Sequence, residues 1–383
     1  MKYIARSLFI LAIFGLAMAS PTGAQETESA AQKAGGVKGL EKRIKQLEDA
    51  IGRDVESDNW YVRIKISGLV EVEAVYDALD TKDPASPDES RSEIDLSTVE
   101  LVADAKITRH VDGHVMVKWE ADELFVDEGF ITLVGAESFP AYLIAGRQYI
   151  PFGYYESSFV TDPTTLVLGE TSNGAVVAGY RFGGDMMDIS VGAFNGRVKK
   201  IGDDNTISDV VAAVVVNPIE GLMLGASYTS NLAASDSLSE ATDVDGDADL
   251  TNNISSLVGG WSVFATYGFL DRFKLIGEYT AAASEFKAGE LYDATDTKKR
   301  QPSAWNIELG VTLTDAWELA GRYGGSSDGD AGGGEFMAET EYGAILNWGL
   351  FENTNLALEY LHSEYQEDFQ TQDTVTLQLA IEF

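Results

Sequence analysis

Apolar and polar side chains alternate strictly in the last stretch of the chain, residues 373–383. Because successive residues of a strand face opposite sides, this stretch predicts a strand with one apolar face. The same period of two begins near Trp60 and recurs along the rest of the chain. Strands that are apolar on one face and polar on the other fit either a half-buried sheet or a barrel surrounded by lipid.

The lengths of the connections separate these two interpretations. Strands are predicted at 60–76, 93–109, 111–121, 129–137, 140–150, 174–183, 186–195, 208–217, 221–230, 257–269, 271–284, 303–314, 316–324, 338–349, 353–363 and 373–383. Every second connection is a tight turn, whereas the others, such as 77–92, 122–128 and 151–173, are longer. This alternation is typical of outer-membrane barrels. The predicted fold class is therefore all-β, an antiparallel transmembrane β-barrel of about 16 strands over residues 60–383.

The N-terminal region predicts export from the cytoplasm. Residues 1–24 carry an early positive charge, an apolar run and then small side chains, as a secretory signal peptide does. Cleavage after Ala24 is favoured, with Ala19 as the alternative. Residues 25–36 predict a flexible linker.

A heptad pattern follows at 37–56 and predicts a short helical coiled coil in the periplasm. It has two interpretations, a stalk that helps to form a homotrimer, or an amphipathic helix that rests on the barrel or frays.

Composition excludes several classes of function. The formal net charge of −35 argues against a basic surface for nucleic acid, and the lack of cysteine excludes disulfides and thiolate metal sites. The acidic run 243–249 resembles the start of a calcium loop, but Ala248 stands where the loop needs glycine and Ile254 where it needs glutamate. No nucleophile has a base partner. The sequence therefore predicts no metal site, no cofactor and no enzyme.

A barrel of this size encloses water, so its function is expected in the lumen. The third long connection, 151–173, is unusually aromatic and apolar for an external loop, and we expect it to fold into the barrel. The alternative is a loop that packs over the rim without selecting solutes.

Charged residues of the wall and of this loop are the candidate pore-lining and constriction site. Arg147 and Arg181 are expected to attract an anionic solute, and Asp162, Glu170 and Tyr154 to shape the narrowest point near them. Lys118 and Arg322 are expected to line the pore as well.

The closing segment also carries an expected assembly signal. Its members share the apolar face and end on the C-terminal aromatic: Leu377, Leu379, Ile381 and Phe383. This pattern resembles the signal that bacterial outer-membrane barrels present to the barrel assembly machinery. Outer-membrane lipid and lipopolysaccharide are the other expected partners.

Three segments carry a resemblance to a known family. The motifs are G-R-Q-Y-I-P-F-G at 146–153, T-D-P-T-T-L-V-L-G-E-T at 161–171 and W-Y-V-R-I-K-I-S-G-L-V-E-V-E at 60–73. They resemble the LbtU family of siderophore porins and, more distantly, porins selective for phosphate or carbohydrate. The resemblance implies an integral outer-membrane porin that passes a small solute, such as a ferric siderophore, without a plug domain. A general diffusion porin, and a structural or adhesive barrel without transport, are the alternatives.

Overall fold

The computed structural model describes residues 63–81, 89–121, 123–184, 186–243, 254–329, 336–365 and 370–383. The predicted signal peptide, linker and coiled coil lie outside the described residues. Among the described helices, none combines the length and the apolar character needed to cross a membrane.

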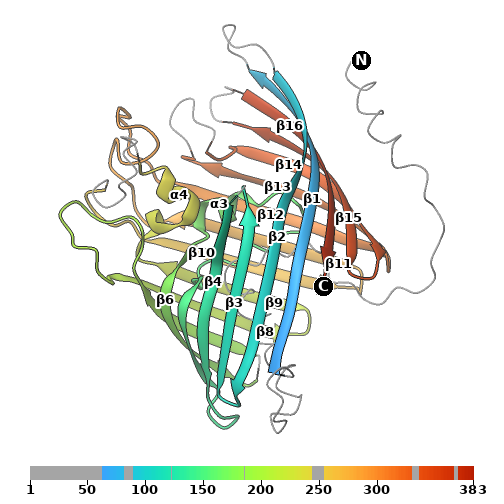
Figure 1. The fold of residues 1–383 in the computed structure, drawn as a ribbon. Coiled ribbons are helices and arrows are strands. Elements are labelled where there is room, and N and C mark those ends of the chain that lie inside the picture. Colours follow the sequence, from blue (N-terminus) through green and yellow to red (C-terminus); the bar gives the residue numbers. More distant parts are fainter. Residues whose placement is uncertain are drawn as a thin grey trace.

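Sixteen antiparallel strands form one closed barrel, so the predicted fold class is confirmed (Figure 1). The strands are β1 (Ile64–Thr81), β2 (Glu89–Thr108), β3 (Val111–Glu120), β4 (Glu123–Val134), β5 (Ala141–Tyr149), β6 (Ser172–Phe182), β7 (Met187–Phe194), β8 (Asp209–Ile219), β9 (Leu222–Thr229), β10 (Gly260–Phe269), β11 (Phe273–Ala282), β12 (Ser303–Thr314), β13 (Trp317–Ser327), β14 (Thr340–Phe351), β15 (Thr354–Glu364) and β16 (Gln370–Glu382). Each strand pairs with its neighbours in sequence, and β1 pairs with β16.

The connection predicted at 122–128 is wrong, because strand β4 already begins at Glu123. The cause is a register shift opposite Met116 and Val117, where Asp127 is the extra residue between the paired Val126 and Glu128. One inserted residue changes the side-chain parity, so the strand does not show one continuous alternation in the sequence. The hairpin of β1 and β2 also extends into the predicted loop 77–92.

The two faces of the wall differ as the alternation predicts. On β12, Ile307 and Leu309 point outward and are 52% and 49% exposed, whereas Asn306 and Glu308 point inward and are buried. The same alternation continues on β15, where Leu358 is exposed and Glu359 is buried. The outer face is therefore apolar and the lumen-facing side is polar, the arrangement found in barrels that cross a membrane.

The C-terminal residue completes the seam between β1 and β16. The amide of Gly68 donates to the Phe383 carbonyl at 2.9 Å, and the amide of Phe383 donates to the Gly68 carbonyl at 3.0 Å. A Cβ atom on Gly68 would lie 2.5 Å from the Phe383 ring and 2.7 Å from the carbonyl oxygen of Glu100. The glycine therefore provides the space in which the C-terminal ring lies.

We expect Gly68→Ala to impair closure of the barrel, because the added methyl group must displace the ring or a neighbouring strand. The measurement is the fraction of protein that migrates as the compact, heat-modifiable form on gels after refolding in detergent. Gly113→Ala is the matched control, since a Cβ atom there would meet nothing within 4 Å. Equal folded fractions for the two variants would contradict the role of Gly68.

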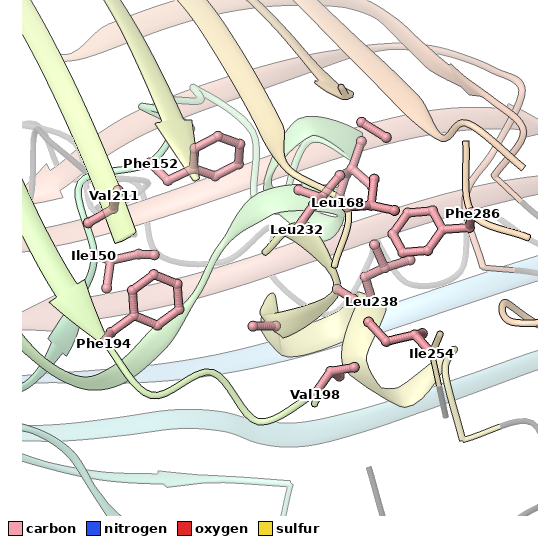
Figure 2. Close-up of a cluster of buried hydrophobic side chains, with 14 of the residues drawn as sticks. Ile150, Phe152, Leu168, Phe194, Val198, Val211, Leu232, Leu238, Ile254 and Phe286 are labelled. Atoms are coloured by element: carbon pink, nitrogen blue, oxygen red, sulfur yellow. The ribbon is translucent and has the colours of Figure 1, made fainter. Parts of the chain in front are cut away.

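Connecting segments pack together inside the barrel and against its wall. We call 150–171 loop 3 and 230–259 loop 5; they contain the short helices α3 (Thr164–Gly169), η2 (Leu232–Ala234) and α4 (Asp236–Glu240). Figure 1 shows α3 and α4 beside one another within the barrel outline. Their apolar side chains form one buried cluster with residues of the wall and of other loops (Figure 2).

Candidate functional site

Loop 3 crosses the lumen because its main-chain amides bind carboxylates of the opposite wall. Both oxygens of Glu278 on β11 accept hydrogen bonds, from the amides of Tyr154 at 2.8 Å and Tyr155 at 2.7 Å. An irregular segment inside a protein needs acceptors for its amides, and an ionised carboxylate is a strong one. Glu278 thus anchors the first part of the loop.

Two further carboxylates bind the middle of the loop. Glu308 on β12 accepts the amide of Ser158 at 2.7 Å and the hydroxyl of Ser157 at 2.8 Å. Glu359 on β15 accepts the amide of Val160 at 2.6 Å and the hydroxyl of Thr161 at 2.6 Å. The three anchors lie on strands that are far apart in sequence, so loop 3 follows the inner surface of the wall from β11 to β15.

Arg322 on β13 connects these anchors, and its side chain is 0% exposed. Its guanidinium donates to Glu308 at 3.0 Å, to Glu341 at 3.1 Å and to the Thr161 carbonyl at 2.8 Å. The same group lies over the ring of Phe159, 4.3 Å from its centroid. The sequence predicted that Arg322 lines the pore, but the structure places it beneath loop 3, out of contact with solvent.

Tyr154 also faces the wall and not the open lumen. Its ring stacks on Phe264 of β10 with centroids 5.0 Å apart, and only 3% of the residue is exposed. The preceding Gly153 has φ of +72°, and a Cβ atom there would lie 2.0 Å from the ring of Tyr155. The aromatic content of loop 3 thus serves its packing, and the Tyr154 ring is not exposed to the lumen.

Most of loop 3 is buried, and five of its residues are half-buried: Val160, Thr161, Asp162, Val167 and Glu170. The two charged residues among them, Asp162 and Glu170, are both acidic. Burial raises the pKa of the Glu170 carboxyl well above its usual range, and the charges of Asp162, Asp236 and Asp127 raise it further, against the opposing effect of Lys118. These groups must therefore lie within electrostatic reach of one another.

Strands β1 to β3 carry further charges on the lumen-facing side. Lys118 on β3 is buried on the inward parity and forms an ion pair with Glu120 at 2.9 Å. Its partner across the β2–β3 pair is Glu100, and Glu73 lies on the inward side of β1. Because the charge of Lys118 lowers the pKa of Glu170, this part of β3 lies within electrostatic reach of loop 3.

The two arginines expected to attract an anion lie apart. Arg147 at the end of β5 is paired with Gly174 of β6, and its Nε donates to the carbonyl of Asp127 at 3.1 Å. Arg181 lies seven residues farther along β6, which corresponds to about 23 Å. There it forms an ion pair with Asp188 at 3.5 Å, near the turn to β7. Arg181 is therefore far from loop 3.

The charges of Asp162 and Lys118 act on Glu170, so the structure places these three predicted residues within electrostatic reach of one another. Arg147 is exposed, in register with Gly129 and Gly174, and its charge acts on Asp236.

The sequence interpretation did not include the loop anchors Glu278, Glu308 and Glu359 as site residues, or Asp127 and Asp236, whose charges act on Glu170. The inward parity identifies the three anchors as lumen-facing carboxylates. Their amide partners are more than 100 residues away in the sequence, so no local signal marks those contacts. Within the described ranges, no group of three or more potential ligand residues is placed to hold a metal ion.

Sequence comparison finds distant relatives. A UPF0422 protein of Coxiella burnetii is 25% identical over 282 residues, which cover 70% of this chain and 58% of the relative. A UPF0422 protein of Legionella pneumophila strain Lens is 24% identical, with 65% and 49% covered. The chain thus spans about half the length of the curated relatives it matches. No protein-family model matches the chain.

Comparison with solved structures finds the same architecture. The outer membrane channel DcaP of Acinetobacter baumannii superposes with a TM-score of 0.58 at 14% identity, covering 84% of this chain and 97% of DcaP. The anion-selective porin of Comamonas acidovorans has a TM-score of 0.55 at 12% identity, with 84% and 99% covered. OprB of Pseudomonas putida has a TM-score of 0.55 at 11% identity, with 90% and 97% covered. The chain shares their fold. At these identities the likeness is one of fold alone.

Proposed function

We propose that the chain is an integral outer-membrane porin through which small hydrophilic solutes diffuse passively. The observation that carries this proposal is loop 3, which three wall carboxylates hold across the interior of a closed barrel. The apolar outer face supports insertion in lipid, and the fold shared with outer-membrane channels supports passage through the lumen. A structural or adhesive barrel is the second candidate, and it predicts no conductance.

We further propose that the pore prefers cations. Asp162 and Glu170 are half-buried on loop 3, and Glu73, Glu100 and Lys118 lie on the lumen-facing side of β1 to β3. We infer that the two sets face one another, because the charge of Lys118 acts on Glu170. Fixed charge at a narrow point sets the sign of the ions that pass. Arg181, which was expected to favour anions, is distant from this point and lies beside Asp188.

This charge pattern bears on the solute. An acidic narrow point repels phosphate and any ferric siderophore of net negative charge, and it favours neutral or cationic solutes. A siderophore would then pass only as a neutral or positively charged complex, and an uncharged carbohydrate would pass without electrostatic preference. The homotrimer and the coiled coil at 37–56 remain predictions of the sequence.

Reversal potentials in planar lipid bilayers test the proposal. With purified protein in a KCl gradient, we expect stable conductance and a permeability to K⁺ that exceeds that to Cl⁻ severalfold. In Asp162→Asn with Glu170→Gln, recorded at alkaline pH so that Glu170 is ionised despite its raised pKa, this ratio should fall about twofold or more, because two charges of the same sign are removed from the narrow point.

The matched control removes two carboxylates elsewhere. Glu137→Gln with Glu220→Gln changes exposed residues in turns at the opposite end of the barrel, and it should leave the ratio nearly unchanged. Conductance no greater than that of bare lipid, or a preference for Cl⁻ in the natural sequence, would contradict the proposal.

A further inference from the structure

We infer that Ser235 and Asp236 of loop 5 form a clamp that positions the Glu170 side of the constriction. This inference rests on the proposed function, since a positioning role needs a channel whose narrow point is formed by loop 3. Loop 5 had no expected role beyond that of an external connection. Its two clamp residues bind the part of loop 3 that returns to β6.

Three hydrogen bonds make the clamp. The hydroxyl of Ser235 donates to the carbonyl of Leu168 at 2.9 Å, and the amide of Asp236 donates to the carbonyl of Glu170 at 2.8 Å. The carboxylate of Asp236 accepts the amide of Ser172 at 2.8 Å. Loop 5 therefore forms a hydrogen bond with each of the alternate residues Leu168, Glu170 and Ser172, and Glu170 is the middle one.

The position of Ser235 in the chain supports this assignment. It precedes the first residue of α4, where a serine side chain usually accepts a hydrogen bond from a helix amide. Here Ser235 makes no such capping bond, and its hydroxyl binds loop 3 instead. Helix α4 therefore lacks its side-chain cap, and the Ser235 hydroxyl instead joins loop 5 to loop 3.

The clamp is fixed in place by apolar packing. Leu232 and Leu238 flank it in sequence and are fully buried in the same cluster as Leu168 of loop 3 (Figure 2). Phe286 and Ile254 complete this environment. Because a packed cluster resists displacement, Ser235 and Asp236 cannot move independently of α3.

The clamp also brings a titratable charge beside Glu170. One carboxylate oxygen of Asp236, Oδ1, is buried and has no hydrogen-bond partner among the described residues, and its ion-pair partner, Arg197, lies 3.7 Å away. Burial raises the pKa of Asp236 to about 6, against the opposing effects of the Ser172 amide, Arg197 and Arg147, while Asp127 raises it further.

Other charged and titratable groups face this carboxylate from the surrounding elements. Glu170 lies on loop 3, and the charge of Asp236 raises the pKa of its side chain. Tyr149 lies at the end of β5, where its hydroxyl donates to the carboxylate of Asp127 at 3.1 Å. As the pH falls through about 6, Asp236 gains a proton and its negative charge beside the constriction disappears. In the natural sequence, the preference for K⁺ should therefore weaken between pH 7.5 and pH 5.

Two variants test the clamp. In Asp236→Asn, an oxygen still accepts the Ser172 amide, but the charge is gone. The group that titrates near pH 6 is then absent, so the preference for K⁺ should change less between pH 7.5 and pH 5 than in the natural sequence. In Ser235→Ala with Asp236→Ala, two of the three hydrogen bonds are lost, and open-channel current noise should rise at least about twofold.

The single variant Asp236→Asn should keep noise close to that of the natural sequence, because the acceptor remains. Glu240→Gln, an exposed carboxylate on the same helix, is the control and should change neither quantity. If the natural protein is a cation-preferring channel but the pH dependence of Asp236→Asn and the noise of the double variant match the natural sequence, the clamp inference fails alone. If the natural protein does not conduct or prefers anions, the proposed function fails. If the double variant does not fold, the pH dependence of Asp236→Asn decides.

Discussion

Arg322→Met should reduce the free energy of unfolding by about 3–5 kcal/mol, the range typical of removing one partner from a buried ion pair. The side chains of Glu308 and Glu341 are 0% and 7% exposed, and both lose their cation. Loop 3 also loses the donor to the Thr161 carbonyl. The measurement is urea unfolding in detergent micelles, followed by tryptophan fluorescence.

A second substitution shows how much of the lost stability comes from the unpaired carboxylates and how much from the lost packing of Arg322. Adding Glu308→Gln to Arg322→Met removes one of the uncompensated charges, so we expect stability to recover in part. Arg109→Met is the control, because Arg109 is exposed in the turn between β2 and β3. If Arg322→Met and Arg109→Met unfold at the same urea concentration, the buried network does not stabilise the barrel.

Glu278→Ala with Glu359→Ala should release loop 3 from the wall and raise single-channel conductance severalfold. The two carboxylates accept four main-chain amides, those of Tyr154, Tyr155, Val160 and Thr161. Without these acceptors the amides favour water, and the loop no longer narrows the lumen. Planar-bilayer recordings measure the conductance, and the same recordings should show a weaker preference for K⁺.

The control is another lumen-facing carboxylate. Glu318 lies on β13 with the same inward parity as Arg322, and its side chain makes no hydrogen bond to loop 3 among the described residues. Glu318→Ala should therefore leave conductance close to that of the natural sequence. A double variant that folds and conducts like the natural protein would show that these amide contacts do not hold the constriction.

Side-chain alternation was sufficient to predict the barrel. Strands such as β12 and β15 contain an apolar side chain at every second position, and this pattern depends only on which face meets lipid. It failed at β4, where Asp127 adds one residue and reverses the parity within the strand. A bulge is defined by pairing with the neighbouring strand, so the sequence of one strand does not reveal it.

The candidate site was less predictable than the fold. The aromatic composition of loop 3 correctly indicated burial, but it did not show that Tyr154 packs on Phe264 or that Asp162 and Glu170 stay half-buried. Inward parity identified Arg181 and Arg322 as lumen-facing charges. It did not give their positions along the barrel axis or show which segments cover them. In the structure, Arg181 lies far from loop 3 and Arg322 lies beneath it.

The amino-acid pattern alone was enough to establish the strand number, the apolar outer face and an unusual third loop, because each depends on local periodicity or composition. The contacts that hold loop 3 inside the barrel join residues more than 100 positions apart, such as Glu278 with Tyr154 and Glu359 with Val160. Closing the barrel creates these contacts. The three-dimensional fold therefore determines which of the inward charges bind loop 3 and which, such as Arg322, are neutralised beneath it.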